Sequence, residues 1–461
     1  MGTERPATQS WVLAVGLVVA FGVAVWLRWR GLAVTSALGD AMGPWWVGAR
    51  GPLRTTPHAP PYGWMLALPH GLLVRTSGSL WQAVAGMHVL HAMIAPIGGL
   101  ATARLARKTG PGLVVAALLA VEPGLLDTCL SGAEGYLAAV ALGLVTLGTT
   151  SPTWGPWLVA VAFPWAVMNH PLALVAGAPL LILVPWSRGP LIVLGSLLLP
   201  HLGSLVGEVG GAVAPSTSPL TAVDAWLRMA GVQSLVLGLA MLGGLWTTTT
   251  RRWTLAALSG LVLTLAAGAA VGALKDHHLR MLMVPLMVGV AGIPGRAYLG
   301  LWLALRIPAD PVQRPSQGLR PGTLGLLHHT AQAIDAAVPG PLVVEGAVVS
   351  GVPAVEPGAL VLALSMAGRG AEGFSVDGTV AVVVTADRTQ HDPIPDGLHT
   401  LAARDTWQVR LGTPAEVYDW TGRLCAVFPQ TRRQSAQDAW PVVHPEAEAA
   451  ELDGSWGCGL R

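Results

Sequence analysis

The chain begins with a series of apolar stretches that are separated by short polar breaks. A helix needs roughly 20 apolar residues to cross the 30 Å hydrocarbon core of a bilayer. The pattern therefore predicts an α-helical polytopic membrane domain of about 10–11 transmembrane helices, one for each apolar stretch of about this length. The expected spans are 11–27, 80–103, 112–128, 133–149, 154–168, 171–186, 189–206, 231–247, 253–273 and 279–295, with a shorter run at 297–306 as the eleventh.

The last third of the chain has a different pattern. Residues 321–338 have the amphipathic period of a helix, which should end at Pro339 and Gly340. Six short runs rich in β-branched and aliphatic residues predict strands at 342–344, 360–364, 380–384, 408–411, 416–418 and 424–428. Continuous apolar strands are typical of a sheet covered on both faces. We therefore expect a transmembrane domain over 1–307 and a small soluble α/β domain over 308–461.

The composition of the whole chain also indicates a membrane protein. Hydrophobic residues make up 52% of the chain and charged residues 11%, whereas a soluble globular protein carries about 25% charge. A wholly soluble enzyme and a disordered chain are therefore excluded. The net charge of +2 gives no reason to expect a nucleic-acid partner. The three cysteines, Cys129, Cys425 and Cys458, are too widely spaced for a disulfide framework or a zinc cluster.

The charges are unevenly distributed. Residues 1–310 contain 17 basic and 9 acidic residues, and the remainder contains 10 and 16. The strongest basic cluster, 104–108, should face the cytoplasm, with Arg188 and Arg251 on the same side. Alternating spans then place the polar breaks around Asp40, around Asp127 and at 275–280 on the external side, which predicts an active site there. Ten spans would leave the C-terminal domain in the cytoplasm, and eleven would place it outside.

Asp40 is the only acid in the first external loop and could act as a general base toward an acceptor hydroxyl. Its alternative role is a helix cap or an ion pair with Arg50 or Arg54. Four cationic or imidazole groups within six positions could bind a lipid phosphate, or could simply flank a helix. These four are Lys275, His277, His278 and Arg280.

The other candidates also have two interpretations. Glu122 lies within an apolar stretch, where an acid is either functional or a hydrogen-bonded structural group. Asp127 and Glu134 could hold Mg²⁺ or Mn²⁺ together with Asp40. His58 and His170 are either structural or contact a sugar. His88 and His91, three residues apart on one helix, are expected to hydrogen-bond between helices, with a metal pair as the alternative.

Several of these residues occur in an order that resembles the GT-C superfamily of polytopic glycosyltransferases, which includes protein O-mannosyltransferases and aminoarabinose transferases. The order is a first helix, an external acid, a tryptophan-rich amphipathic segment, and the segment 58–64 with its His-Ala-Pro-Pro-Tyr-Gly-Trp sequence. Further similar features are Glu122-Pro123, the Asn-His-Pro at 169–171, and the basic run ending at Arg280. The resemblance covers about 1–300. It departs at Asp40, which is followed by Ala41 instead of a second acid, and at Glu134, where an arginine is common.

The resemblance implies transfer of a sugar from a polyprenyl-phosphate donor to a lipid, glycan or protein acceptor. Asp40 would be catalytic, and 275–280 would bind the donor phosphate. The substrate contacts would include His58, Tyr62, Glu122, Glu134 and His170. The expected location is a bacterial inner membrane, with the site facing outward. The alternatives are a transporter or lipid flippase, or a non-catalytic membrane scaffold. A transporter should show internal repeats around a midplane site, and the sequence has no such repeat.

Overall fold

The structure is a computed structural model of the 461-residue chain. It describes residues 7–38, 41–50, 63–132, 136–211, 220, 232–271, 276–292, 319–348, 354–369, 374, 380–386, 398–404, 407–417, 419–420, 432–435 and 455–457. The predicted span at 297–306 and the predicted strand at 424–428 lie outside these residues.

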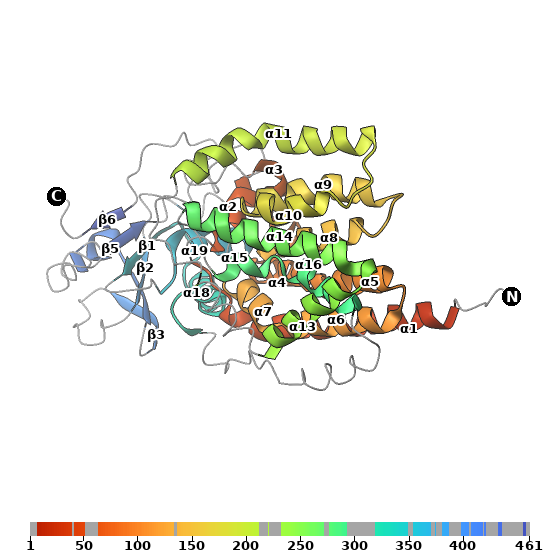
Figure 1. Cartoon of the computed structure of the whole chain (residues 1–461). Coiled ribbons are helices and arrows are strands. Elements are labelled where there is room, and N and C mark those ends of the chain that lie inside the picture. The colour runs from red at the N-terminus through yellow and green to blue at the C-terminus, as the bar shows by residue number, and fades with distance from the viewer. Residues whose placement is uncertain are drawn as a thin grey trace.

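Helices form most of the described chain and assemble into a bundle (Figure 1). They are α1 (Ala7–Gly31), η1 (Leu32–Val34), α2 (Gly43–Arg50), α3 (Gly63–Thr76), α4 (Leu80–Ala92), α5 (Ile94–Ala106), α6 (Thr109–Val121), α7 (Pro123–Leu130), α8 (Tyr136–Gly148), α9 (Gly155–Asn169), α10 (Ala173–Leu181), α11 (Arg188–Gly211), α13 (Val232–Trp246), α14 (Thr248–Val271), α15 (Asp276–Arg280), α16 (Met283–Met287) and η3 (Val288–Gly292). The helical character predicted for 1–307 is therefore confirmed, and its insertion into a membrane stays a prediction.

Three described segments are long and apolar enough to cross a membrane: Ser10–Val34, Leu80–Ala106 and Thr250–Ala270. A fourth candidate combines α6 and α7, which are bent by 43° at their junction. The other apolar helices include Tyr136–Gly148 and Arg188–Leu199, which are shorter than a full span. Prolines inside α9 and α10 interrupt their backbone hydrogen bonding. The expected number of ten or eleven spans stays a prediction.

Close helix packing in the bundle depends on small residues. A Cβ atom on Gly112 of α6 would lie 2.5 Å from the carbonyl oxygen of Gly99 on α5. A Cβ on Gly16 of α1 would lie 2.2 Å from Leu113. These contacts place the N-terminal half of α1 beside the turn between α5 and α6, as expected for helices that approach through small residues.

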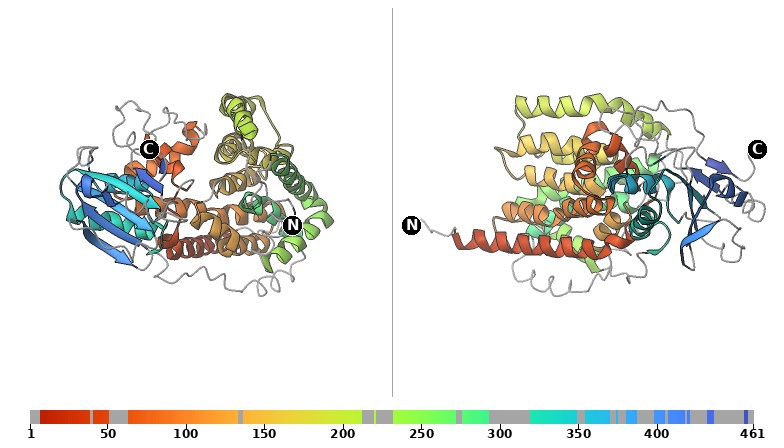
Figure 2. Two further views of the ribbon diagram at one scale, coloured as in Figure 1. Left: turned by 90° about the vertical axis from the view of Figure 1, so that its left-hand side faces the viewer. Right: turned by 180° about the vertical axis from the view of Figure 1, so that it is seen from behind.

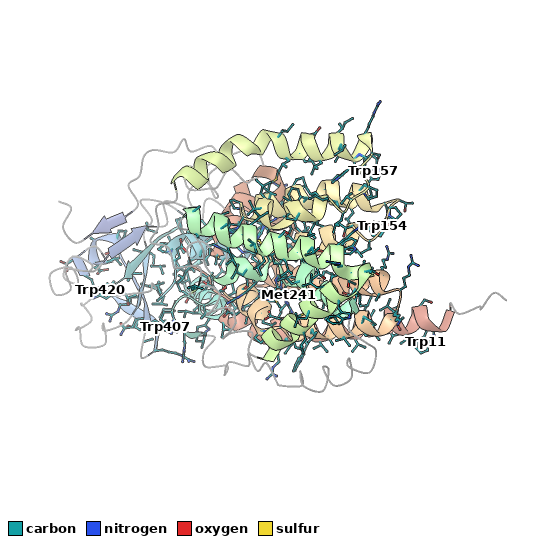
Figure 3. The ribbon with its side chains drawn as sticks, viewed as in Figure 1. Trp11, Trp154, Trp157, Met241, Trp407 and Trp420 are labelled. Atoms are coloured by element: carbon teal, nitrogen blue, oxygen red, sulfur yellow. The ribbon has the colours of Figure 1, made fainter. Side chains whose placement is uncertain are left out.

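Tryptophans mark both ends of α1. Trp11, Trp26 and Trp29 are more than half exposed. With a rise of 1.5 Å per residue, Trp29 lies about 27 Å along the axis from Trp11, close to the thickness of a bilayer core of about 30 Å. Trp154 and Trp157 lie at the Trp11 end of the bundle (Figure 3). The arrangement matches the aromatic belts of membrane proteins. In contrast, Trp45 is buried against His70.

In the part of the chain that the structure describes, the C-terminal region forms a six-stranded mixed sheet with two longer helices. Its elements are α18 (Leu324–Ala337), β1 (Leu342–Val348), α19 (Pro357–Met366), β2 (Val380–Ala386), β3 (His399–Arg404), β4 (Trp407–Gly412), β5 (Arg432–Ser435) and β6 (Ser455–Gly457). The strand order is β3-β4-β2-β1-β5-β6, and β1 and β2 are parallel, with Leu342 opposite Val380. Buried residues on both sides of β2 confirm a sheet covered on two faces.

Two strand predictions are wrong. Residues 360–364 lie inside α19, the crossover helix between β1 and β2. A parallel pair needs such a crossover, and full burial of this helix makes its sequence as apolar as a strand. Glu416 and Val417 lie in a short helical segment, where Glu416 bonds back to Thr413. The predicted helix at 321–338 and the strands at 342–344, 380–384 and 408–411 are confirmed.

The sheet and the N-terminal end of α1 lie at opposite ends of the molecule (Figure 2). The C-terminal region joins the bundle at the end of the first span. The backbone N–H of Leu324 donates to the oxygen of Thr35 at 2.7 Å, and that of Ala37 donates to Gly322 at 2.9 Å. The buried core is continuous across this junction. The C-terminal region therefore lies at the end of the bundle opposite the basic turn 104–108.

Candidate active site

The α6–α7 bend positions a buried acid. Glu122 is the N-cap of α7, and its Oε2 accepts a hydrogen bond from the backbone N–H of Leu125. Pro123 follows at the first helical position, where proline is favoured because no N–H is needed. The side chain of Glu122 is almost fully buried. The expected membrane-embedded acid is thus a helix cap at a break, and its Oε1 has no hydrogen-bond partner among the described residues.

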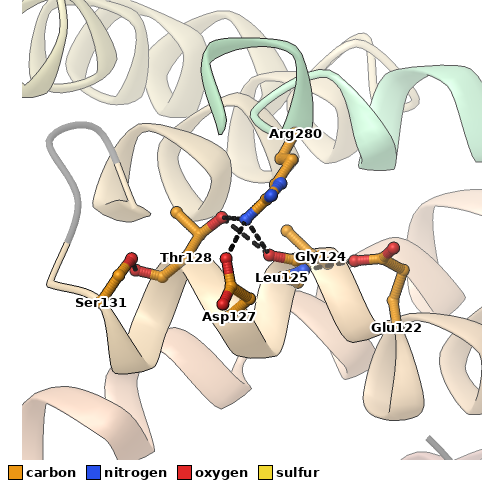
Figure 4. A network of polar contacts seen from close by, with 7 residues as sticks. All are labelled: Glu122, Gly124, Leu125, Asp127, Thr128, Ser131 and Arg280. Atoms are coloured by element: carbon orange, nitrogen blue, oxygen red, sulfur yellow. Dashed lines mark hydrogen bonds and ion pairs between the residues drawn. The ribbon is translucent and has the colours of Figure 1, made fainter. Parts of the chain in front are cut away.

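Arg280 converges on the same bend from a distant part of the sequence (Figure 4). Its Nη1 donates to the carbonyl oxygen of Gly124 at 2.9 Å, to Asp127 Oδ2 at 2.8 Å and to Thr128 Oγ1 at 2.7 Å. The Arg280 side chain is 2% exposed, whereas that of Asp127 is 57% exposed. The pair therefore has a buried cation and an acid that reaches solvent.

Gly124 leaves the space that this arrangement requires. A Cβ atom there would lie 3.1 Å from Glu122 Oε1 and 3.2 Å from Arg280 Nε. A side chain at this position would therefore crowd the carboxylate and the guanidinium. Glycine allows both groups to approach the α7 backbone.

A second buried arginine lies on α1. Arg28 Nε donates to His91 Nδ1 at 3.0 Å, and its Nη1 donates to the oxygen of Ala24 at 2.9 Å. Glu122 interacts electrostatically with both Arg28 and Arg280. The acid is therefore within electrostatic range of two guanidinium groups, one from α1 and one from α15. Sequence reasoning missed Arg28, although its position within an apolar helix was the available signal.

Histidines extend the polar cluster from Arg28. His88 Nε2 lies 3.5 Å from the Thr35 hydroxyl, and His70 Nε2 lies 3.2 Å from the Tyr136 hydroxyl. His91 Nε2 has no hydrogen-bond partner among the described residues. His88 and His91 thus contact α1 and the segment that follows it, which agrees with the predicted bonding between helices.

His170 and His278 lie beside each other. Their ring centroids are 4.3 Å apart, and both side chains are buried. His170 also accepts a hydrogen bond from the backbone N–H of Leu172 through Nδ1 at 3.2 Å. The structure thus brings the predicted sugar-contact histidine to the predicted phosphate-binding run, although the sequence separation is more than 100 residues.

Other predicted site residues lie outside the described residues: Asp40, His58, Tyr62, Glu134 and Lys275. The side chain of His277 is not described either, although its backbone belongs to α15. The structure describes the chain up to residue 38 and again from residue 41, on the two sides of Asp40. Ser36 N–H donates to the oxygen of Leu130 at 2.7 Å, and a Cβ on Gly132 would contact Ala41 at 2.6 Å. The flanking residues therefore lie at the C-terminal end of α7, which carries Asp127.

A divalent-metal role for Asp127 stays a prediction. Among the described residues, no group of three or more histidine, cysteine, aspartate or glutamate side chains could hold a metal ion. Asp127 is instead paired with Arg280, which supplies a positive charge where a cation would bind.

Two of the basic residues predicted to face the cytoplasm, Arg104 and Arg188, lie at the other end of the bundle. Arg104 stacks over the Trp154 ring at 4.8 Å, and Trp154 lies near the start of α9. Arg188 begins α11 at its contact with Trp157. The acids Glu122 and Asp127 are thus separated from these bases along the bundle axis, as the alternation of spans predicts. No family model matches the chain, and neither curated proteins nor solved structures gave a match.

Proposed function

We propose that the chain is a GT-C-like membrane glycosyltransferase, which moves a sugar from a polyprenyl-phosphate donor to an acceptor at the external face of the membrane. The observation that carries the proposal is the convergence of Glu122, Asp127 and Arg280 at one end of an apolar bundle. Arg28, which interacts with Glu122, lies between Trp26 and Trp29 on α1. The cluster therefore lies at the level of an aromatic belt, where lipid headgroups are found.

In this proposal Arg280 binds the donor phosphate. An arginine forms strong hydrogen bonds with phosphate oxygens, and the guanidinium pairs with Asp127 at 2.8 Å. Because the Asp127 side chain is exposed, it can move toward water when a phosphate replaces it. Burial of Arg280 keeps the cation fixed before the donor arrives, which reduces the reorganisation needed during the reaction.

Asp40 is the proposed general base. Its carboxylate accepts the proton of the acceptor hydroxyl, and the hydroxyl oxygen forms a bond to the anomeric carbon. The bond between that carbon and the phosphate oxygen breaks, and polyprenyl phosphate leaves with the electron pair. The placement of Ser36 and Ala41 beside the end of α7 supports this role, because it brings the chain around Asp40 to the Asp127–Arg280 pair.

The test uses purified protein in proteoliposomes with a panel of polyprenyl-phosphate sugars. Arg280→Lys keeps the charge and loses the planar guanidinium, so we expect the donor KM to rise about tenfold, equivalent to one charged hydrogen bond. Arg188→Lys at the opposite end is the matched control and should leave the KM unchanged. Equal KM values for both variants would contradict the donor role of Arg280.

The buried Arg28–His91 pair favours transport as the second candidate. Ionisable groups inside spans also mark substrate paths. Uptake of a lipid-linked sugar or small solute into sealed vesicles, lost in His91→Ala and without sugar transfer, would support a transporter and exclude the enzyme.

A further inference from the structure

A groove separates the bundle from the C-terminal region at their junction. Its volume is about 490 Å³, within the range of small-molecule sites. The start of α4 forms one wall through Trp81 and Gln82, and α18 forms the other through His328, Gln332 and Asp335. We call this space the interface groove. It is distinct from the Glu122–Arg280 cluster.

The lining of the interface groove is amphipathic. Leu327 is among the buried apolar residues of its floor, and Trp81 adds a half-buried indole. The Trp81 and His328 rings lie 5.2 Å apart and are inclined by 32°. Gln82 and Gln332 are exposed, so their amides are accessible from solvent. The Gln332 amide offers both a donor and an acceptor of hydrogen bonds, whereas Gln82 Oε1 already accepts from the Gly78 N–H at 2.9 Å and its NH2 group offers donors.

The charge of the described lining residues disfavours an anionic ligand. Asp335 is the only formally charged group among the described lining residues, and its Oδ1 pairs with Arg369 at 3.3 Å. The described lining therefore holds no arginine or lysine of the kind that binds phosphate or carboxylate. Its accessible polar groups are amides, an imidazole and one carboxylate, which suit hydroxyl groups.

We propose that the interface groove binds a neutral saccharide. A pyranose ring has apolar C–H groups that can pack on Trp81 and the apolar floor, and a rim of hydroxyls that can bond to Gln82, Gln332 and Asp335. Trp81 precedes His88 by seven residues on α4, about 10 Å along the axis. The saccharide would therefore lie about two helical turns from the buried histidines, toward the C-terminal region.

The experiment measures binding of the full chain in nanodiscs to an array of neutral and phosphorylated oligosaccharides. The strongest neutral binder is then titrated by calorimetry. Gln332→Leu preserves volume and removes both amide groups at an exposed position, so the fold should be retained. We expect affinity to fall at least fivefold. His329→Ala, adjacent on α18 and outside the groove lining, is the control and should change affinity by less than twofold.

Three results would overturn the inference: no neutral oligosaccharide binds, phosphorylated sugars bind more tightly, or Gln332→Leu has no effect. A variant at Arg280 separates this site from the proposed active site. If Arg280→Lys removes saccharide binding and Gln332→Leu does not, the saccharide belongs to the Glu122–Arg280 cluster, and the groove proposal alone fails. Saccharide binding that survives Arg280→Lys, together with an absence of sugar transfer by the wild-type protein, would support the groove and reject the glycosyltransferase.

Discussion

Arg280 and Asp127 form an ion pair whose two members should contribute very differently to stability. In Arg280→Met the volume is largely kept, but Gly124 O and Thr128 Oγ1 lose a donor. Gly124 O keeps the hydrogen bond from the Thr128 hydroxyl at 2.7 Å, so the cost is that of the lost bonds to the guanidinium, about 1.5–3 kcal/mol for a hydrogen bond to a charged group. Asp127 adds little to this cost because its side chain is 57% exposed and can be hydrated. We therefore expect Arg280→Met to lower the free energy of unfolding by about 2–4 kcal/mol.

Asp127→Asn removes only the exposed half of the pair. Ion pairs that reach solvent contribute about 0–1 kcal/mol, and Arg280 retains its bonds to Gly124 and Thr128 in this variant. The assay is reversible unfolding by SDS titration in mixed micelles, followed by tryptophan fluorescence. Equal losses of unfolding free energy in the two variants would refute the reasoning, because they would show that the exposed carboxylate contributes as much to stability as the buried guanidinium.

Three further predictions follow from local packing and titration. Gly112→Leu should lower the free energy of unfolding by about 1–3 kcal/mol, since α5 leaves no room for the side chain; Gly110→Leu, which meets nothing within 4 Å, is the control in the same SDS titration. Hydrogen bonds from Thr413 N–H and Oγ1 lower the pKa of Glu416 below 4.5. The stabilisation by the charged Glu416 should therefore be lost as pH falls through this lowered pKa. The melting temperature of Glu416→Gln should not show this loss at low pH. Burial lowers the pKa of His328 below 6.5, so the unfolded chain binds the proton more readily than the folded protein. The melting temperature should therefore decrease as the pH is lowered beyond about 6.5. A His328→Gln variant whose melting temperature depends on pH as steeply as that of the wild type would contradict this.

The sequence predicted the local elements best where periodicity and burial agree. The amphipathic pattern before Pro339 produced α18, and the valine run at 380–384 produced β2. The prediction was wrong for 360–364, because a helix buried on all sides has no polar face. Periodicity cannot separate such a helix from a buried strand.

The site was predicted in part. Charge alternation placed Asp127 and Arg280 on one side of the bundle, and the structure joins them at 2.8 Å. The sequence gives no indication that Arg28 interacts with Glu122, because this interaction depends on how α1 packs against α6 and α7. Nor could it reveal the interface groove, whose walls lie more than 200 residues apart in the chain and meet only through docking of the C-terminal region.

The central claim is that an outward-facing site at this end of the bundle transfers a sugar with Asp40 as the base. The most direct measurement is the single-turnover rate of transfer from polyprenyl-phosphate sugars in proteoliposomes, for the wild type and for Asp40→Asn. Loss of a general base should lower the rate by about 10²–10⁴-fold, while the melting temperature stays unchanged. An equal rate in both proteins would contradict the account.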